Sequence, residues 1–174
     1  MAFSVGSIAP DSGIPDEKWE NFTPPPLVTH FKAPEGSRYV TQDLDFYRGY
    51  LAAFSKNNGN PQEYSFRLGY FSHLLADSLW ADNIVKVTRE RFQDQITANR
   101  DFMWKIKKDW YGLDFVYVRN HPQSLFWRVF LNCDYPVNYL DFLIHEGVRQ
   151  RISYIKEYYQ KQDEKTDELT NREW

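Results

Sequence analysis

Four side chains that can bind a metal ion occur in the first half of this chain. His73 and Asp77 are four residues apart in a stretch of helical periodicity, so their side chains project from one face about one turn apart. Asp77 lies among apolar residues, and a buried carboxylate is costly unless it is paired or bound to a metal. The sequence therefore predicts a partner for Asp77, although a simple pair of hydrogen-bonded side chains is an alternative at this point.

The preceding segment supplies two further ligand candidates. Asp11 lies beside Ser12-Gly13, turn-forming neighbours that can aim a carboxylate inward, and His30 follows the run Pro24-Pro25-Pro26. Two imidazoles and two carboxylates suit Zn²⁺ or another divalent transition metal, but not Ca²⁺, which prefers oxygen ligands alone. A turn-capping role for Asp11 and a packed loop position for His30 are the alternatives.

The elements that would position these residues are mainly helical. Proline and glycine concentrate in residues 1–42, which favours a long ordered N-terminal loop packed on the helices. Beyond it, the periodicity of apolar residues predicts helices, and the second of them is expected to be buried nearly all round. The predicted helices run from Asp43 to the stop at Asn57, from Pro61 to Ala81, through Ile84–Trp110, from Pro122 to Asn132 and from Val137 to about Gln160.

Length and composition agree with one all-α domain. The 174 residues are 42% hydrophobic and 18% aromatic, which is ample for one core. We expect a metal-binding helical domain over residues 1–160 and a polar C-terminal tail over residues 161–174.

The net charge of −3 indicates no nucleic-acid surface, and no apolar run reaches the roughly 20 residues of a membrane span. A cytoplasmic location is expected, because no signal peptide is evident and Cys133 is the single cysteine.

Three stretches carry a resemblance to a known family. They are the segment from Gly6 to Gly13, which contains Ala9-Pro10-Asp11, then Thr29-His30-Phe31, then the segment from Gly69 to Asp77 with Trp80 close behind. Together they resemble the bacterial zinc-dependent phospholipases C, over roughly residues 6 to 90. The resemblance implies an all-helical fold related to that of S1/P1-type nucleases and metal-dependent hydrolysis of a phosphoester.

Residue by residue, the resemblance assigns Asp11, His30, His73 and Asp77 to one metal position of that family. Trinuclear members have further histidines, which this chain lacks: residues 1–10 contain none, and none follows His73 until His121. We therefore expect one zinc ion per chain, with another divalent transition metal as the alternative.

The function that the resemblance implies for these residues is hydrolysis of a small phosphoester by one metal-activated water, with Asp11 or Asp77 accepting or orienting the proton. Four protein ligands can also close a zinc site, which is typical of structural zinc. The alternative is accordingly a non-catalytic helical scaffold or ligand-binding domain that holds a structural metal. An HD-type phosphohydrolase is excluded, because the sequence has no His-Asp dipeptide.

Other reactive side chains give weaker signals. His145-Glu146 begins like the zinc motif H-E-x-x-H, but Arg149 stands where the second histidine is needed. His121 precedes a proline and is expected in a turn. Cys133 has no activating neighbour in sequence, so a small buried side chain is the better interpretation.

Overall fold

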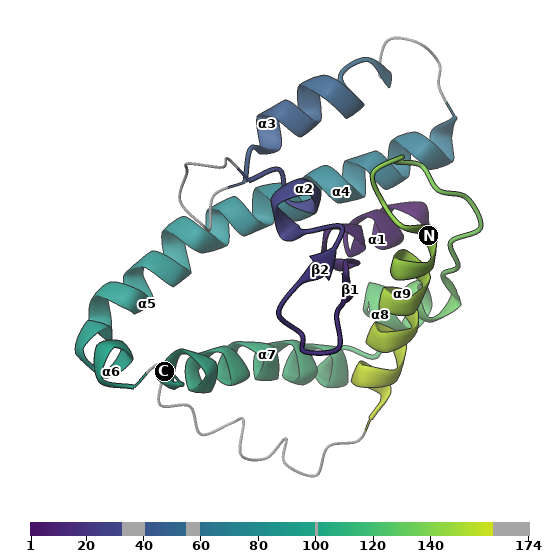
Figure 1. Ribbon diagram of the computed structural model, residues 1–174. Helices are drawn as coiled ribbons and strands as arrows, with labels where there is room; N and C mark the ends of the chain where they lie inside the picture. The colour runs from purple at the N-terminus through teal and green to yellow at the C-terminus, as the bar shows by residue number, and fades with distance from the viewer. Residues whose placement is uncertain (33–40, 55–59, 100, 162–174) are drawn as a thin grey trace.

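The computed structural model describes residues 1–32, 41–54, 60–99 and 101–161 (Figure 1). The fold is a mainly helical single domain with one two-stranded sheet, which confirms the all-α prediction. The elements are α1 (Ala2–Gly6), η1 (Ala9–Asp11), β1 (Ile14–Pro15), β2 (Phe22–Thr23), α2 (Pro26–Thr29), α3 (Asp43–Phe46), η2 (Tyr47–Leu51), α4 (Pro61–Trp80), η4 (Ala81–Val85), α5 (Lys86–Arg91), α6 (Gln93–Ala98), α7 (Phe102–Asn120), α8 (Leu125–Arg128), η5 (Phe130–Asn132) and α9 (His145–Gln160). Of the predicted polar tail, only Lys161 lies within the described residues.

The N-terminal segment has more regular structure than a long loop. Helix α1 starts directly after Met1, and β1 pairs with β2 as a short antiparallel hairpin. Two of the prolines that predicted loop, Pro10 and Pro26, instead occupy the first turns of η1 and α2, where a missing N–H costs nothing. The expectation of one long ordered loop is therefore not confirmed, and part of it, residues 33–40, lies outside the described residues.

Helix α4 forms where the sequence predicts it. Pro61 occupies its first turn, and the Asn60 side chain accepts a hydrogen bond of 3.0 Å from the backbone N–H of Gln62. The expectation that this helix is buried nearly all round is wrong. Phe66, Gly69, Tyr70 and Leu74 are buried on one face, whereas Leu75, Leu79 and Trp80 are 41%, 56% and 42% exposed. This second face is only partly covered: Trp80 contacts Trp110 of α7 edge-to-face.

Two glycines let α1 cross α4 at backbone contact. A Cβ atom at Gly6 would collide with the Phe66 carbonyl, and one at Gly69 would collide with the Phe3 carbonyl. The crossing therefore depends on the absence of side chains at both positions. It brings Ser7, the residue after α1, against the face of α4 that carries His73.

The longer helices line two sides of the molecule, and the core lies between several elements. In Figure 1, α4 and α5 run along one side of the molecule and α7 along the other, joined through α6. The core lies where α1, α3 and α4 meet α9 and the segment before it; Phe46 stacks on Tyr70 at 4.7 Å between ring centroids. The largest fully buried side chains among the described residues are Phe46, Phe66, Tyr70, Tyr135, Leu74, Ile106 and Leu140.

Several predicted helix boundaries differ from those observed. The range Ile84–Trp110 is divided among η4, α5, α6 and the first half of α7. Helix α9 begins at His145 rather than Val137, because Tyr135 and Asn138 hold the preceding segment in an irregular path: the Tyr135 hydroxyl donates to Asn138 Oδ1 at 2.8 Å and accepts from the Tyr139 N–H. Apolar spacing alone does not reveal such local hydrogen bonds.

Candidate metal centre

His73 is held on α4 with one ring nitrogen engaged and the other available. Its Nδ1 lies 2.8 Å from the Ser7 carbonyl oxygen, so Nδ1 carries the proton and donates it to that carbonyl. Nε2 is then left with a lone pair. Within the described part of the chain this atom is buried and has no hydrogen-bond partner. A buried lone pair of this kind can be satisfied by a metal ion or by a hydrogen-bond donor.

His30 is held by the end of α2. Its Nδ1 lies 3.0 Å from the Thr29 hydroxyl, and the Thr29 carbonyl accepts a hydrogen bond from the Tyr70 hydroxyl. Burial raises the pKa of Tyr70 far above its usual range, so this phenol keeps its proton and remains a donor. Phe31, the next residue, ends α2 in the left-handed region at φ 49°, and its ring packs edge-on against Phe46.

Asp11 closes the group from η1. One carboxylate oxygen lies 3.2 Å from His30 Nε2, and the other lies 3.2 Å from the guanidinium of Arg151 on α9. Burial raises the pKa of the Asp11 carboxyl, but the His30 hydrogen bond and the electrostatic effects of His73 and Arg151 outweigh it. The net pKa lies well below the ordinary value, so Asp11 is ionised at neutral pH and can serve as a metal ligand.

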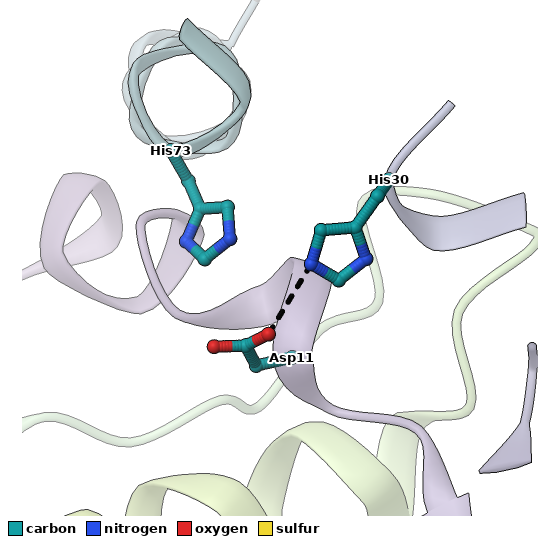
Figure 2. Close-up of side chains that lie close together, drawn as sticks. All are labelled: Asp11, His30 and His73. Carbon is teal, nitrogen blue, oxygen red and sulfur yellow. Dashed lines mark ion pairs between the residues drawn. The ribbon is translucent and has the colours of Figure 1, made fainter. Parts of the chain in front are cut away.

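These three side chains come from three elements and point toward one another (Figure 2). One ligand atom from each of Asp11, His30 and His73 lies within 4.8 Å of the other two. Two imidazole nitrogens and a carboxylate form the protein ligand set of many catalytic zinc sites, which leave the fourth position open. The donor set and the unpartnered His73 Nε2 therefore fit a zinc ion.

Asp77 lies at the edge of this triad. Its Oδ2 is 3.7 Å from the Nε2 atoms of both His30 and His73, and its side chain is 41% exposed. The sequence-based expectation that Asp77 is buried is thus wrong, because the α4 face that carries it opens onto a pocket. That pocket has a volume of about 750 Å³ and is lined by His73 and Asp77 together with residues of η4, α5 and α7.

The family comparison agrees with this geometry. The model of the zinc-dependent phospholipase C family matches residues 1–174, the whole chain. The chain belongs to the zinc-dependent phospholipase C family. Comparison with curated proteins and with solved structures gives no significant match. The family's zinc dependence agrees with a metal centre at Asp11, His30 and His73, the residues that the sequence pattern identified together with Asp77.

The other histidines and Cys133 are engaged elsewhere. His121 Nδ1 lies 2.8 Å from the Tyr117 carbonyl, and His145 Nε2 lies 2.6 Å from the Tyr135 carbonyl. Cys133 is 2% exposed and burial raises the pKa of its thiol, as expected for a structural side chain rather than a nucleophile. The structure brings none of these three residues into the triad.

The sequence analysis did not identify the residues that orient the candidate ligands. Ser7 contacts His73, and Thr29 contacts His30. Thr29 directly precedes His30, so a search for hydrogen-bonding neighbours would have found Thr29. Arg151 gives no such signal, since it lies 140 residues beyond Asp11 on another helix. None of the helices in the described ranges is long and apolar enough to span a membrane.

Proposed function

We propose that this protein hydrolyses a phosphodiester, with one zinc ion held by Asp11, His30 and His73. The observation that supports it best is the buried, unpartnered His73 Nε2 beside two further zinc-type ligand atoms, on a histidine that also lines a large pocket. Bound zinc supplies a Lewis acid, which lowers the pKa of water and polarises a phosphoryl oxygen. The protein's own residues orient the ligands, accept a proton and hold the substrate.

Asp77 is the proposed proton acceptor. Both oxygens of Asp11 are already engaged, one by His30 and one by Arg151, so that carboxylate is fixed. The surroundings of Asp77 suit a general base better than those of Asp11. Asp77 lines the pocket, and the imidazole nitrogens of His30 and His73 lie 3.7 Å from it, beyond hydrogen-bond distance. Its position beside the triad suits removal of a proton from an attacking water.

The outer contacts keep the ligand atoms in place. The Ser7 carbonyl fixes the tautomer of His73, and Thr29 together with Tyr70 orients His30. Arg151 holds the carboxylate of Asp11. Such outer contacts typically change metal affinity by about 10–100-fold when they are removed.

A structural metal is the competing function, and the position of Asp77 is the observation that favours it. Asp77 Oδ2 lies 3.7 Å from the Nε2 atoms of His30 and His73. A small shift of this carboxylate toward them would supply a fourth ligand and close the site. The metal would then tie the N-terminal segment to α4 without taking part in a reaction.

The Asp77→Asn variant separates these roles. For the proposed enzyme, the zinc-loaded variant keeps its metal and loses most kcat on bis(p-nitrophenyl) phosphate, a soluble phosphodiester. Asp82→Asn removes an exposed carboxylate on η4 that does not line the pocket and serves as the control. Loss of zinc from Asp77→Asn, together with no zinc-dependent turnover by the wild type, would favour the structural metal.

A further inference from the structure

The pocket beside the triad carries more cationic than anionic side chains. Lys32, Arg89 and Lys107 line it, against the carboxylates of Asp77 and Asp114. One of the two carboxylates, that of Asp114, accepts a hydrogen bond of 3.1 Å from the Tyr159 hydroxyl. Three cationic and two anionic side chains leave the pocket lining with a net positive formal charge, and a bound zinc ion would add to it.

A second part of the pocket wall is apolar. Trp80 from α4 and Trp110 from α7 meet edge-to-face at 5.5 Å between ring centroids, and the apolar residues Val85, Met103 and Ala81 also line the pocket. Such a wall suits hydrocarbon. The combination of an apolar wall, cationic side chains and the metal triad matches an amphiphile that carries a phosphate.

We propose that this pocket selects amphiphilic phosphodiesters with an anionic or uncharged headgroup over those with a quaternary ammonium headgroup; this inference rests on the function proposed above. Proteins that recognise quaternary ammonium surround it with aromatic faces, which attract positive charge. Here Lys32, Arg89 and Lys107 occupy the same pocket as the tryptophans and repel such a group. A net negative ligand gains instead from charge-assisted contacts with them.

Calorimetric titration of the full-length, zinc-loaded protein tests the selectivity without reference to turnover. Two probes are used, decylphosphoglycerol and decylphosphocholine, which share the alkyl chain and the phosphodiester and differ in headgroup charge. We expect decylphosphoglycerol to bind about tenfold more tightly at low ionic strength, a factor that corresponds to ~1.4 kcal/mol, and we expect the ratio to fall as salt is added.

Charge-removing variants locate the source of this preference. Lys107→Gln and Arg89→Gln should each bring the ratio of the two dissociation constants closer to one. Lys108→Gln is the matched control: it removes the same charge one residue further along α7, from an exposed side chain outside the pocket lining, and should leave the ratio at the wild-type value. Equal affinities in the wild type, tighter binding of decylphosphocholine, or an unchanged ratio in both pocket variants would overturn the proposal.

Turnover of short-chain phosphatidylglycerol and phosphatidylcholine, measured in parallel, separates failure of this inference from failure of the proposed function. Zinc-dependent hydrolysis of both lipids at equal kcat/KM would contradict the selectivity and leave the enzyme assignment intact. The binding preference without any zinc-dependent hydrolysis would support the selectivity of the pocket and contradict the assignment as an enzyme.

Discussion

His73 Nδ1 lies 2.8 Å from the carbonyl oxygen of Ser7, a residue that precedes it by 66 positions. This contact fixes which nitrogen of His73 faces the other ligand atoms. It exists because α1 and α4 cross at Gly6 and Gly69, where side chains would keep the two backbones apart. The orientation of a ligand on one helix is thus set by the close approach of another.

Removal of the His73 imidazole should abolish tight zinc binding. We expect wild-type protein to hold one zinc ion per chain after dialysis and His73→Ala to retain almost none, a loss larger than the roughly 10–100-fold that outer contacts contribute. Elemental analysis measures both. His121→Ala removes an exposed imidazole outside the triad and should keep its zinc. Stoichiometric zinc in His73→Ala, or two or three tight ions in the wild type, would contradict the assignment.

Gly69→Ala should destabilise the fold and weaken the metal centre together. The added methyl group meets the Phe3 carbonyl and the Ser7 N–H, which moves the Ser7 carbonyl away from His73. Overpacking of this kind costs about 1–3 kcal/mol, which urea unfolding of the metal-free protein can measure. Gly49→Ala is the control, because a Cβ there meets nothing within 4 Å, and it should raise stability by roughly 0.5–1 kcal/mol. Equal stabilities for the two variants would rule out a tight crossing.

Arg151→Met should lower zinc affinity by about tenfold, because Asp11 loses the group that orients its carboxylate. The pKa of Asp11 should also rise, since the Arg151 charge helps to lower it. Competition with a chelator measures the affinity. Arg151→Lys should recover part of the lost zinc affinity, because lysine restores the charge but not the planar guanidinium group. Arg149→Met, an exposed arginine on the same helix, should bind zinc like the wild type.

Stability should decline at alkaline pH because of buried phenols. Burial raises the pKa of Tyr135 to about 12, and the pKa of Tyr70 rises further, from an ordinary value of 10.0. The folded state therefore keeps protons that the unfolded chain releases above pH ~10, so this stability is complete below that pH and is lost as pH rises toward the folded values. Urea unfolding at successive pH values should show a shallower decline in Tyr70→Phe. A flat profile above pH ~10 in the wild type would contradict the prediction.

Local sequence signals explain which parts of the site could be predicted. Helix α4 and the spacing of His73 and Asp77 follow from periodicity and from the capping residues Asn60 and Pro61, all within one segment. The exposure of Asp77 depends on which helix faces acquire a neighbour, and periodicity does not encode that. Arg151 reaches Asp11 only through the packing of α9 against η1, a relationship between distant segments that no local pattern shows.

The candidate ligands and the residues that contact them are distributed unevenly along the chain. Asp11, His30 and His73, with Ser7 and Thr29 behind them, all belong to η1, α2, α4 or residues next to these elements, whereas Arg151 lies on α9. During synthesis the ribosome therefore releases all three proposed zinc ligands before α7 to α9 emerge. Metal capture can precede completion of the core, and Arg151 then acts as a late contact that tightens a centre already assembled.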